Sequence, residues 1–134
     1  GHAYVYFTYG MHFMLNVVTE AEGVAGAVLI RAIEPKLGID AMRARRLAAS
    51  DSALASGPGR LAAALGVDLA CNGTPMGDGP LAVLDAPSPE EAVECSGRIG
   101  LSRGHESELR FYLADCGWVS RSRPGPASKR RGSS

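Results

Sequence analysis

The sequence has no long hydrophobic run and lacks several of the short motifs that mark common classes of protein. No apolar stretch approaches the roughly 20 residues that a membrane-spanning helix needs, and no signal peptide is recognisable. A Walker loop, a GxGxxG turn and an HExxH helix are also absent. Hydropathy and motifs therefore favour neither a membrane protein nor a P-loop, dinucleotide-binding or zinc-protease domain.

Cysteine and histidine are too few and too scattered to predict a metal site. The three cysteines form no CxxC pair and have no histidine at ligand spacing, so we expect buried or idle thiols without a disulfide framework; they are Cys71, Cys95 and Cys116. The histidines are isolated, and we expect structural or exposed roles for His2, His12 and His105. The sequence thus predicts neither a disulfide framework nor a zinc site.

An excess of charge of either sign is lacking as well. Fourteen basic residues balance fourteen acidic ones, but residues 121–134 hold five basic residues and no acid. Residues 1–120 are left with a net charge of −5, which argues against binding driven mainly by phosphate charge. The Pro/Gly/Ser/Arg-rich end at 121–134 is predicted to be a disordered basic tail, and residues 1–120 a single domain.

Three extended segments dominate the first 33 residues. Residues 4–9, 13–19 and 27–33 are rich in β-forming residues and are separated by Gly10 and by the turn at 20–23. Such spacing predicts an antiparallel meander. Four polar side chains stand where a plain core would place aliphatic ones, namely Tyr6, Tyr9, Asn16 and Arg31. Because residue 1 is Gly rather than Met and strand character begins almost at once, we expect a fragment of a longer protein.

Two helices are predicted after the meander. The first spans residues 39–49, and its apolar side comprises Ile39, Met42 and Leu47. The other side is a basic face formed by Arg43, Arg45 and Arg46, which either meets solvent or contacts phosphate. The second helix spans 59–65, is entered through Ser56-Gly57-Pro58 and ends at Gly66. Its free N–H groups and Arg60 would suit an anion such as a DNA phosphate.

The remaining sequence is rich in turns and predicts only short extended pieces. Residues 81–85 and 109–113 are expected to be strands, and 97–102 a strand or tight loop where backbone approaches another group closely. Residues 87–94 are expected to form a loop that runs into an acidic stretch.

Five blocks in order carry a family resemblance over residues 2–121. They are YVYFTYGMHFMLNV, AVLIRAIEP, SGPGRLAAALGV, GRIGL and ELRFYLADCGWVSR, and together they resemble the alkyladenine (3-methyladenine, mammalian-type) DNA glycosylases. The resemblance implies one α+β domain: a curved, mainly antiparallel sheet with helices outside it and a β-hairpin that probes DNA.

The same resemblance implies a repair activity. Such enzymes flip an alkylated or deaminated purine, such as 3-methyladenine or hypoxanthine, out of duplex DNA and hydrolyse its glycosidic bond. They act without metal, cofactor or lysine Schiff base. We expect a monomer with damaged double-stranded DNA as its partner, in the cytoplasm or nucleoid of a bacterium or the nucleus of a eukaryote.

Site residues are also implied by position in the motifs. Tyr9 falls where the family has its intercalating wedge, and Tyr6 and Asn16 fall where the family's base pocket stacks and reads the flipped purine. Arg31 and the main-chain carbonyl of Ile99 fall where the attacking water is held. The expected contacts to the DNA backbone are Ser56, Gly57, Arg60 and Gly100.

One departure from the family bears on mechanism. The family's general-base carboxylate stands in a Glu-Ala-Tyr segment upstream of the YVY strand, and this sequence contains no such segment. Glu20, Glu22 and Glu34 do not match that motif. Loss of a general base costs roughly 10²–10⁴-fold in rate, so we expect little or no excision by this chain alone.

Two other interpretations remain open at this stage. The chain could be a damaged-DNA-binding module that kept the wedge and lost catalysis. It could instead be another β-rich nucleotide-handling enzyme whose tyrosines are sheet packing, with Asn16 a satisfied buried amide and Arg31 paired with Glu34 or another acid.

Overall fold

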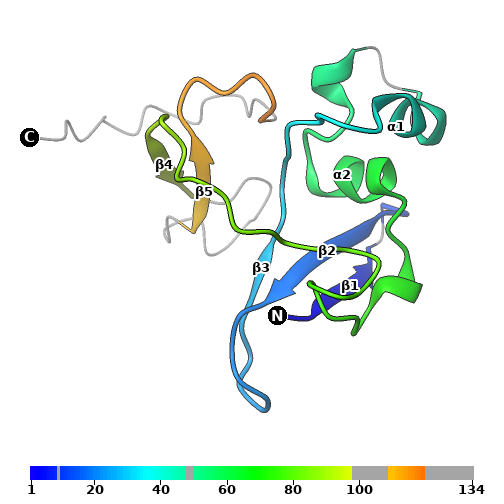
Figure 1. Ribbon diagram of the computed structural model, residues 1–134, viewed down its shortest axis with the longest axis vertical. Coiled ribbons are helices and arrows are strands. Elements are labelled where there is room, and N and C mark those ends of the chain that lie inside the picture. Colours follow the sequence, from blue (N-terminus) through cyan, green and yellow to red (C-terminus); the bar gives the residue numbers. More distant parts are fainter. Residues whose placement is uncertain (9, 48–49, 98–108, 120–134) are drawn as a thin grey trace, which may run out of the picture.

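Two antiparallel sheets and two α-helices form the body of the protein (Figure 1). The computed structural model describes residues 1–8, 10–47, 50–97 and 109–119. In chain order, with η marking short 3₁₀ helices, the elements are β1 (Ala3–Phe7), β2 (Phe13–Val18), β3 (Ala27–Leu29), α1 (Ile39–Arg45), η1 (Asp51–Ala53), α2 (Pro58–Leu65), η2 (Leu69–Cys71), β4 (Val93–Ser96) and β5 (Arg110–Leu113). The expected α+β class is confirmed. Within this described part, no helix is long and apolar enough to cross a membrane.

The predicted meander is confirmed as the sheet β1-β2-β3. Val5 lies opposite Leu15 in the β1–β2 pair, and Asn16 lies opposite Leu29 in the β2–β3 pair. The third strand is shorter than the predicted 27–33. After Ile30, whose N–H still donates to Leu15 at 3.0 Å, the backbone turns to the segment before α2: Ile33 N–H donates to the carbonyl of Ala55 at 3.2 Å.

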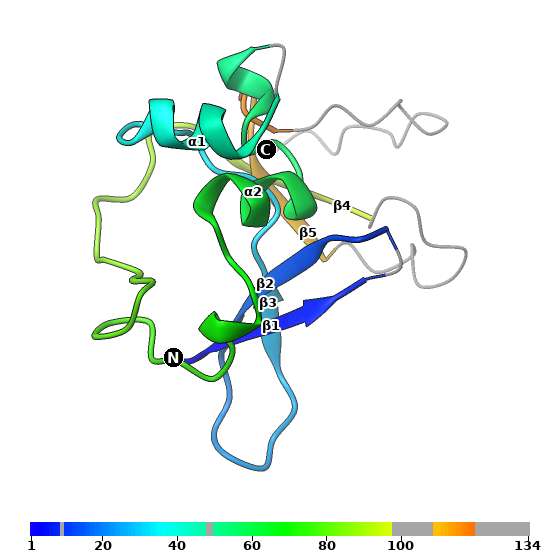
Figure 2. The ribbon, with the colours of Figure 1, turned by 90° about the vertical axis from the view of Figure 1, so that its right-hand side faces the viewer.

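The core lies between the inner face of this sheet and α2, which sits beside β2 (Figure 2). Alternation along β1 buries Ala3 and Val5. Leu61 of α2 and Leu54 just before it are fully buried against them. The helix itself has the predicted extent: it begins at Pro58 and ends at Gly66, whose left-handed backbone (φ 69°) suits glycine.

Helix α1 is shorter than predicted and buries a smaller apolar side. It ends at Arg45 rather than continuing to residue 49, and residues 48–49 lie outside the described part. Met42 is buried and Ile39 half-buried, as expected, but Leu47 is fully exposed. The chain leaves the helix at Arg46, which has extended backbone angles (φ −135°, ψ 133°), so Leu47 no longer shares a face with Met42.

The two arginines of α1 and Arg46, which follows it, bind groups of the protein itself. Arg43 holds Asp51 through two short hydrogen bonds of 2.7 and 2.8 Å, and Arg45 donates to the carbonyl of Ala64 at 2.8 Å. Arg46 donates to the carbonyls of Ala53 and Leu54. Arg43 and Arg45 are exposed and Arg46 is half-buried, so the predicted basic face meets solvent in part. The same guanidinium groups also tie this segment to η1 and α2.

Arg46→Met is expected to destabilise the fold by about 1–3 kcal/mol, because two carbonyls lose a hydrogen bond of about 0.5–1.5 kcal/mol each. Burial, and then the nearby charge of Arg60, lowers the pKa of Arg46 below its ordinary value, and the group still stays charged at neutral pH. Urea unfolding measures the loss. Arg43→Met is the matched control, since its Asp51 partner is half-exposed and can be rehydrated. Equal midpoints for the two variants would contradict this role of Arg46.

The second sheet pairs β4 with β5, with Val93 opposite Leu113. The strand predicted at 109–113 is confirmed as β5, whereas β4 falls partly in the predicted loop at 87–94. Its sequence VECS is polar and mostly exposed, so it carries no apolar pattern that would mark a strand. Residues 81–85 do not form the predicted strand; Val83 and Leu84 are exposed. Of the segment 97–102, only Gly97 lies within the described residues.

Candidate functional site

The side chains of β1, β2 and β3 that point away from the core form one surface, which we call the outer face. Tyr4, Asn16 and Leu29 lie directly opposite one another across the three strands. Because alternate residues of a strand share a face, Tyr6 lies on the same side of β1 as Tyr4. The outer face, defined as Tyr4, Tyr6, Met14, Asn16 and Leu29, thus unites two predicted site residues, Tyr6 and Asn16. Arg31, a third, lies two residues beyond the end of β3.

Two tyrosine rings provide aromatic area at one edge of the outer face. Tyr4 is 47% exposed and Tyr6 36% exposed. Their ring centroids are 5.4 Å apart, with 38° between the ring planes. These rings are therefore not packed into the core, and their exposed surfaces can receive a planar partner by stacking.

Asn16 is the buried polar residue at the centre of the outer face. Only 6% of it is exposed, and its Nδ2 donates to the carbonyl of Tyr4 at 3.3 Å. This bond uses one of the two amide N–H groups and fixes the side chain against β1. Asn16 is thus a satisfied buried amide, as the alternative interpretation describes, and its second amide N–H group has no part in this bond.

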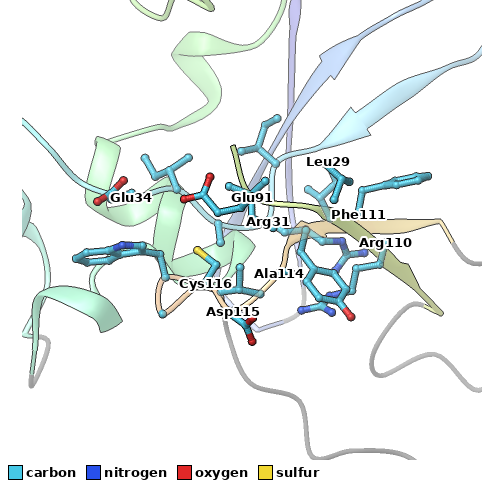
Figure 3. A pocket seen from close by; sticks show the side chains of 18 of the residues that line it. Leu29, Arg31, Glu34, Glu91, Arg110, Phe111, Ala114, Asp115 and Cys116 are labelled. Atoms are coloured by element: carbon cyan, nitrogen blue, oxygen red, sulfur yellow. The ribbon is translucent and has the colours of Figure 1, made fainter. Parts of the chain in front are cut away.

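A cavity of about 620 Å³, which we call the hollow, opens beside β3, between residues 28–34 and residues 109–119 (Figure 3). In the view of Figure 3, Glu34 lies at the left of this hollow, Leu29 and Phe111 lie at the right, and Arg31 lies between them. Glu91 also lines the hollow. The hollow thus extends the outer face from β3 to the second sheet and combines apolar walls with charges of both signs.

Arg110 is a lining residue that the sequence interpretation missed. It is 7% exposed, its Nη1 lies 3.4 Å from the Ser96 hydroxyl oxygen, and its guanidinium carbon lies 4.6 Å from the Tyr112 ring centroid. That distance is within the range of a cation–π contact. The signal that singled out Arg31, one charge in an otherwise apolar strand, is also present here in the strand sequence RFYL.

The predicted backbone contacts at the entry to α2 also lie together. Ser56 is buried and accepts a hydrogen bond from Arg60 Nη1 at 3.3 Å. Gly57 has φ 147°, a backbone conformation that side chains rarely adopt. A Cβ placed on Gly59 would lie 2.8 Å from Cγ of His12. The turn between β1 and β2 is therefore in contact with the first turn of α2.

Three predicted site residues, Tyr9, Ile99 and Gly100, lie outside the described residues. The three glutamates that do not match the family's general-base motif lie in different places. Glu20 and Glu22 are exposed on the connection between β2 and β3, away from the hollow. Glu34 does line the hollow and lies 3.9 Å from Lys36. In the part of the chain that the structure describes, no group of three or more Asp, Glu, His or Cys side chains could hold a metal ion.

Comparison with known proteins adds a family to this geometry. The model of the methylpurine-DNA glycosylase family matches residues 1–117. Three relatives share the name "Putative 3-methyladenine DNA glycosylase". The protein of Chlorobium luteolum is 50% identical over 125 residues, that of Chlorobaculum parvum 47% over 132, and that of Methanoculleus marisnigri 46% over 125. These alignments cover 92%, 98% and 90% of this chain but only 64%, 63% and 65% of the relatives.

Proposed function

The chain belongs to the methylpurine-DNA glycosylase family, and from this premise we propose that its outer face and hollow are the base-recognition part of a DNA glycosylase. The substrates would be alkylated or deaminated purines, such as 3-methyladenine and hypoxanthine, in double-stranded DNA. The reaction would be hydrolysis of the glycosidic bond by a monomer without cofactor.

The observation that carries the proposal is that Tyr6 and Asn16 share the outer face and that Arg31 lines the hollow beside it. Tyr6 offers a ring on which a flipped purine can stack. Asn16 offers an amide fixed by its bond to Tyr4, suited to testing the hydrogen-bonding edge of a base. Arg31 lines the adjacent hollow, where a guanidinium can hold the attacking water.

Contacts to the duplex would flank this face. Tyr9 would fill the space that the flipped base leaves, since an aromatic ring inserted in the stack keeps the base from returning. Ser56, Gly57 and Arg60 would bind the DNA backbone beside that turn. In the wider site, the main-chain carbonyl of Ile99 would share the water with Arg31, and Gly100 would contact the backbone.

The catalytic carboxylate is the missing component. This sequence has no Glu-Ala-Tyr segment, and the chain spans about 63–65% of the length of the three relatives. We propose that the 134 residues recognise damaged purines and that excision needs a general base that they do not supply.

Tyr6→Ala is expected to weaken binding to a hypoxanthine-containing duplex by roughly 5- to 150-fold, the equivalent of about 1–3 kcal/mol for one base–aromatic stack. Fluorescence anisotropy at fixed salt measures the dissociation constants for damaged and undamaged duplexes of the same sequence. Undamaged duplex should bind about equally before and after the change, because only a flipped base reaches Tyr6.

Tyr6→Phe is the matched control, since it keeps the ring and removes only the hydroxyl group. It should retain the preference for the damaged duplex. If Tyr6→Ala keeps that preference and only lowers the melting temperature, the tyrosines are sheet packing and the proposed function is wrong.

A further inference from the structure

The turn between β1 and β2 is closed by a compact set of backbone bonds. Thr8 N–H donates to the carbonyl of His12 at 2.8 Å, and Met11 N–H donates to the carbonyl of Thr8 at 3.1 Å. Met11 has φ 60° and is 81% exposed. A positive φ is unfavourable for a residue with a side chain and persists only where its surroundings hold it. The two backbone bonds of the turn hold Met11 in this conformation.

His12 connects this turn with α2, because its side chain lies close to one glycine in each. A Cβ on Gly59 would lie 2.8 Å from Cγ and 3.0 Å from Cβ of His12. On the other side, a Cβ on Gly10 would lie 3.1 Å from Cδ2 of the same ring. The imidazole thus touches backbone of its own turn and backbone of the first turn of α2, and any side chain at residue 59 would push it away.

Gly59 is otherwise an unfavourable choice for its position. It stands inside α2 without a positive φ, so alanine would fit the backbone and favour the helix. The close approach of His12 is the physical reason that the structure gives for a residue without Cβ.

We infer that His12 is a positioning residue, which fixes the β1–β2 turn against α2 so that both meet duplex DNA as one rigid surface. This inference rests on the proposed function, because the surface is the one assigned to the duplex. It adds a role that belongs to neither the base pocket nor the water: His12 sets the direction of the turn relative to Ser56, Gly57 and Arg60.

A double-mutant cycle on His12→Ala and Gly59→Ala tests this inference. With His12 present, Gly59→Ala should lower the melting temperature and weaken binding to damaged and undamaged duplex alike, by about 2- to 150-fold, the span of couplings measured between contacting residues. In the His12→Ala background, Gly59→Ala should raise the melting temperature, since the clash is gone and alanine favours the helix, and should leave affinity unchanged.

The salt dependence of binding separates positioning from direct contact with a phosphate. His12→Ala should lower affinity without changing the slope of log affinity against log salt, whereas loss of a phosphate contact lowers that slope by about 1. His12→Phe, which keeps a planar ring at the same place, should restore affinity. A changed slope, or no rescue by phenylalanine, would overturn the positioning role.

The cycle also distinguishes this inference from the proposed function. If the chain binds duplex and prefers the damaged one, but Gly59→Ala has the same effect in both backgrounds, only the role of His12 is overturned. If the unaltered chain binds no duplex, both proposals fail.

Discussion

The 134-residue chain is expected to bind hypoxanthine-containing duplex and to release no measurable hypoxanthine. Hydrolysis of a glycosidic bond needs a water that is deprotonated as it attacks, and removing a general base costs roughly 10²–10⁴-fold in rate. The resemblance implies a general-base carboxylate in a Glu-Ala-Tyr segment, which this sequence does not contain. Arg31 can position a water, but a guanidinium cannot accept its proton.

Single-turnover release of the free base, with protein in excess over duplex, measures this prediction. The Chlorobium luteolum relative, of which this chain covers 64%, is assayed under the same conditions for comparison. Detectable release of hypoxanthine by this chain would contradict the prediction.

Two carboxylates that line the hollow are the candidates for a general base if the chain does release hypoxanthine. Glu34 and Glu91 both line it, and Glu34 lies 3.9 Å from Lys36. If base release occurs, Glu34→Gln and Glu91→Gln identify which of them acts as the base, since glutamine keeps the shape and cannot take the proton. With no release, both variants should bind damaged duplex as the unaltered chain does.

The parts of the fold that were predicted correctly are those with local signals. The meander follows from β-forming segments separated by turns, and α2 from a proline at its start and a glycine at its end. The end of α1 has no such signal: Arg46 leaves the helix and binds the carbonyls of Ala53 and Leu54. Strand β4 is polar and is held by pairing with β5, which is distant in sequence. Tertiary contacts determine both the end of α1 and the presence of β4, and a single sequence does not show such contacts.

In the candidate site, too, residues with a sequence signal could be predicted and contacts between distant segments could not. Tyr6, Asn16 and Arg31 could be proposed because each stands in a family motif. Period-two alternation places Tyr6 and Asn16 on one face, and Arg31 lines the hollow beside it. The hollow could not be identified, because its second wall comes from residues 109–119. The contact of His12 with Gly59 was missed for a related reason: a close approach between two segments leaves only a glycine in the sequence, and glycine has many other uses.

Leu61→Ala is expected to have the largest effect on stability, lowering the free energy of unfolding by about 2–5 kcal/mol, the usual cost of truncating a buried leucine. Leu61 is fully buried between α2 and the sheet. Alanine is the better helix former of the two, so the loss can come only from packing. Against a typical total stability of about 5–15 kcal/mol, this change should lower the melting temperature by roughly 10–20 °C.

Leu47→Ala is the matched control, because the same atoms are removed from a side chain that is fully exposed, and such surface changes stay within about 0.5 kcal/mol. Urea unfolding compares the two. Equal effects would contradict the placement of Leu61 in the core. Since Leu61 lies two residues from Gly59, truncating Leu61 should also weaken the contact between His12 and the first turn of α2. At a temperature where Leu61→Ala remains folded, weaker binding to undamaged duplex would show that the packing of α2 holds the DNA-binding turn in place.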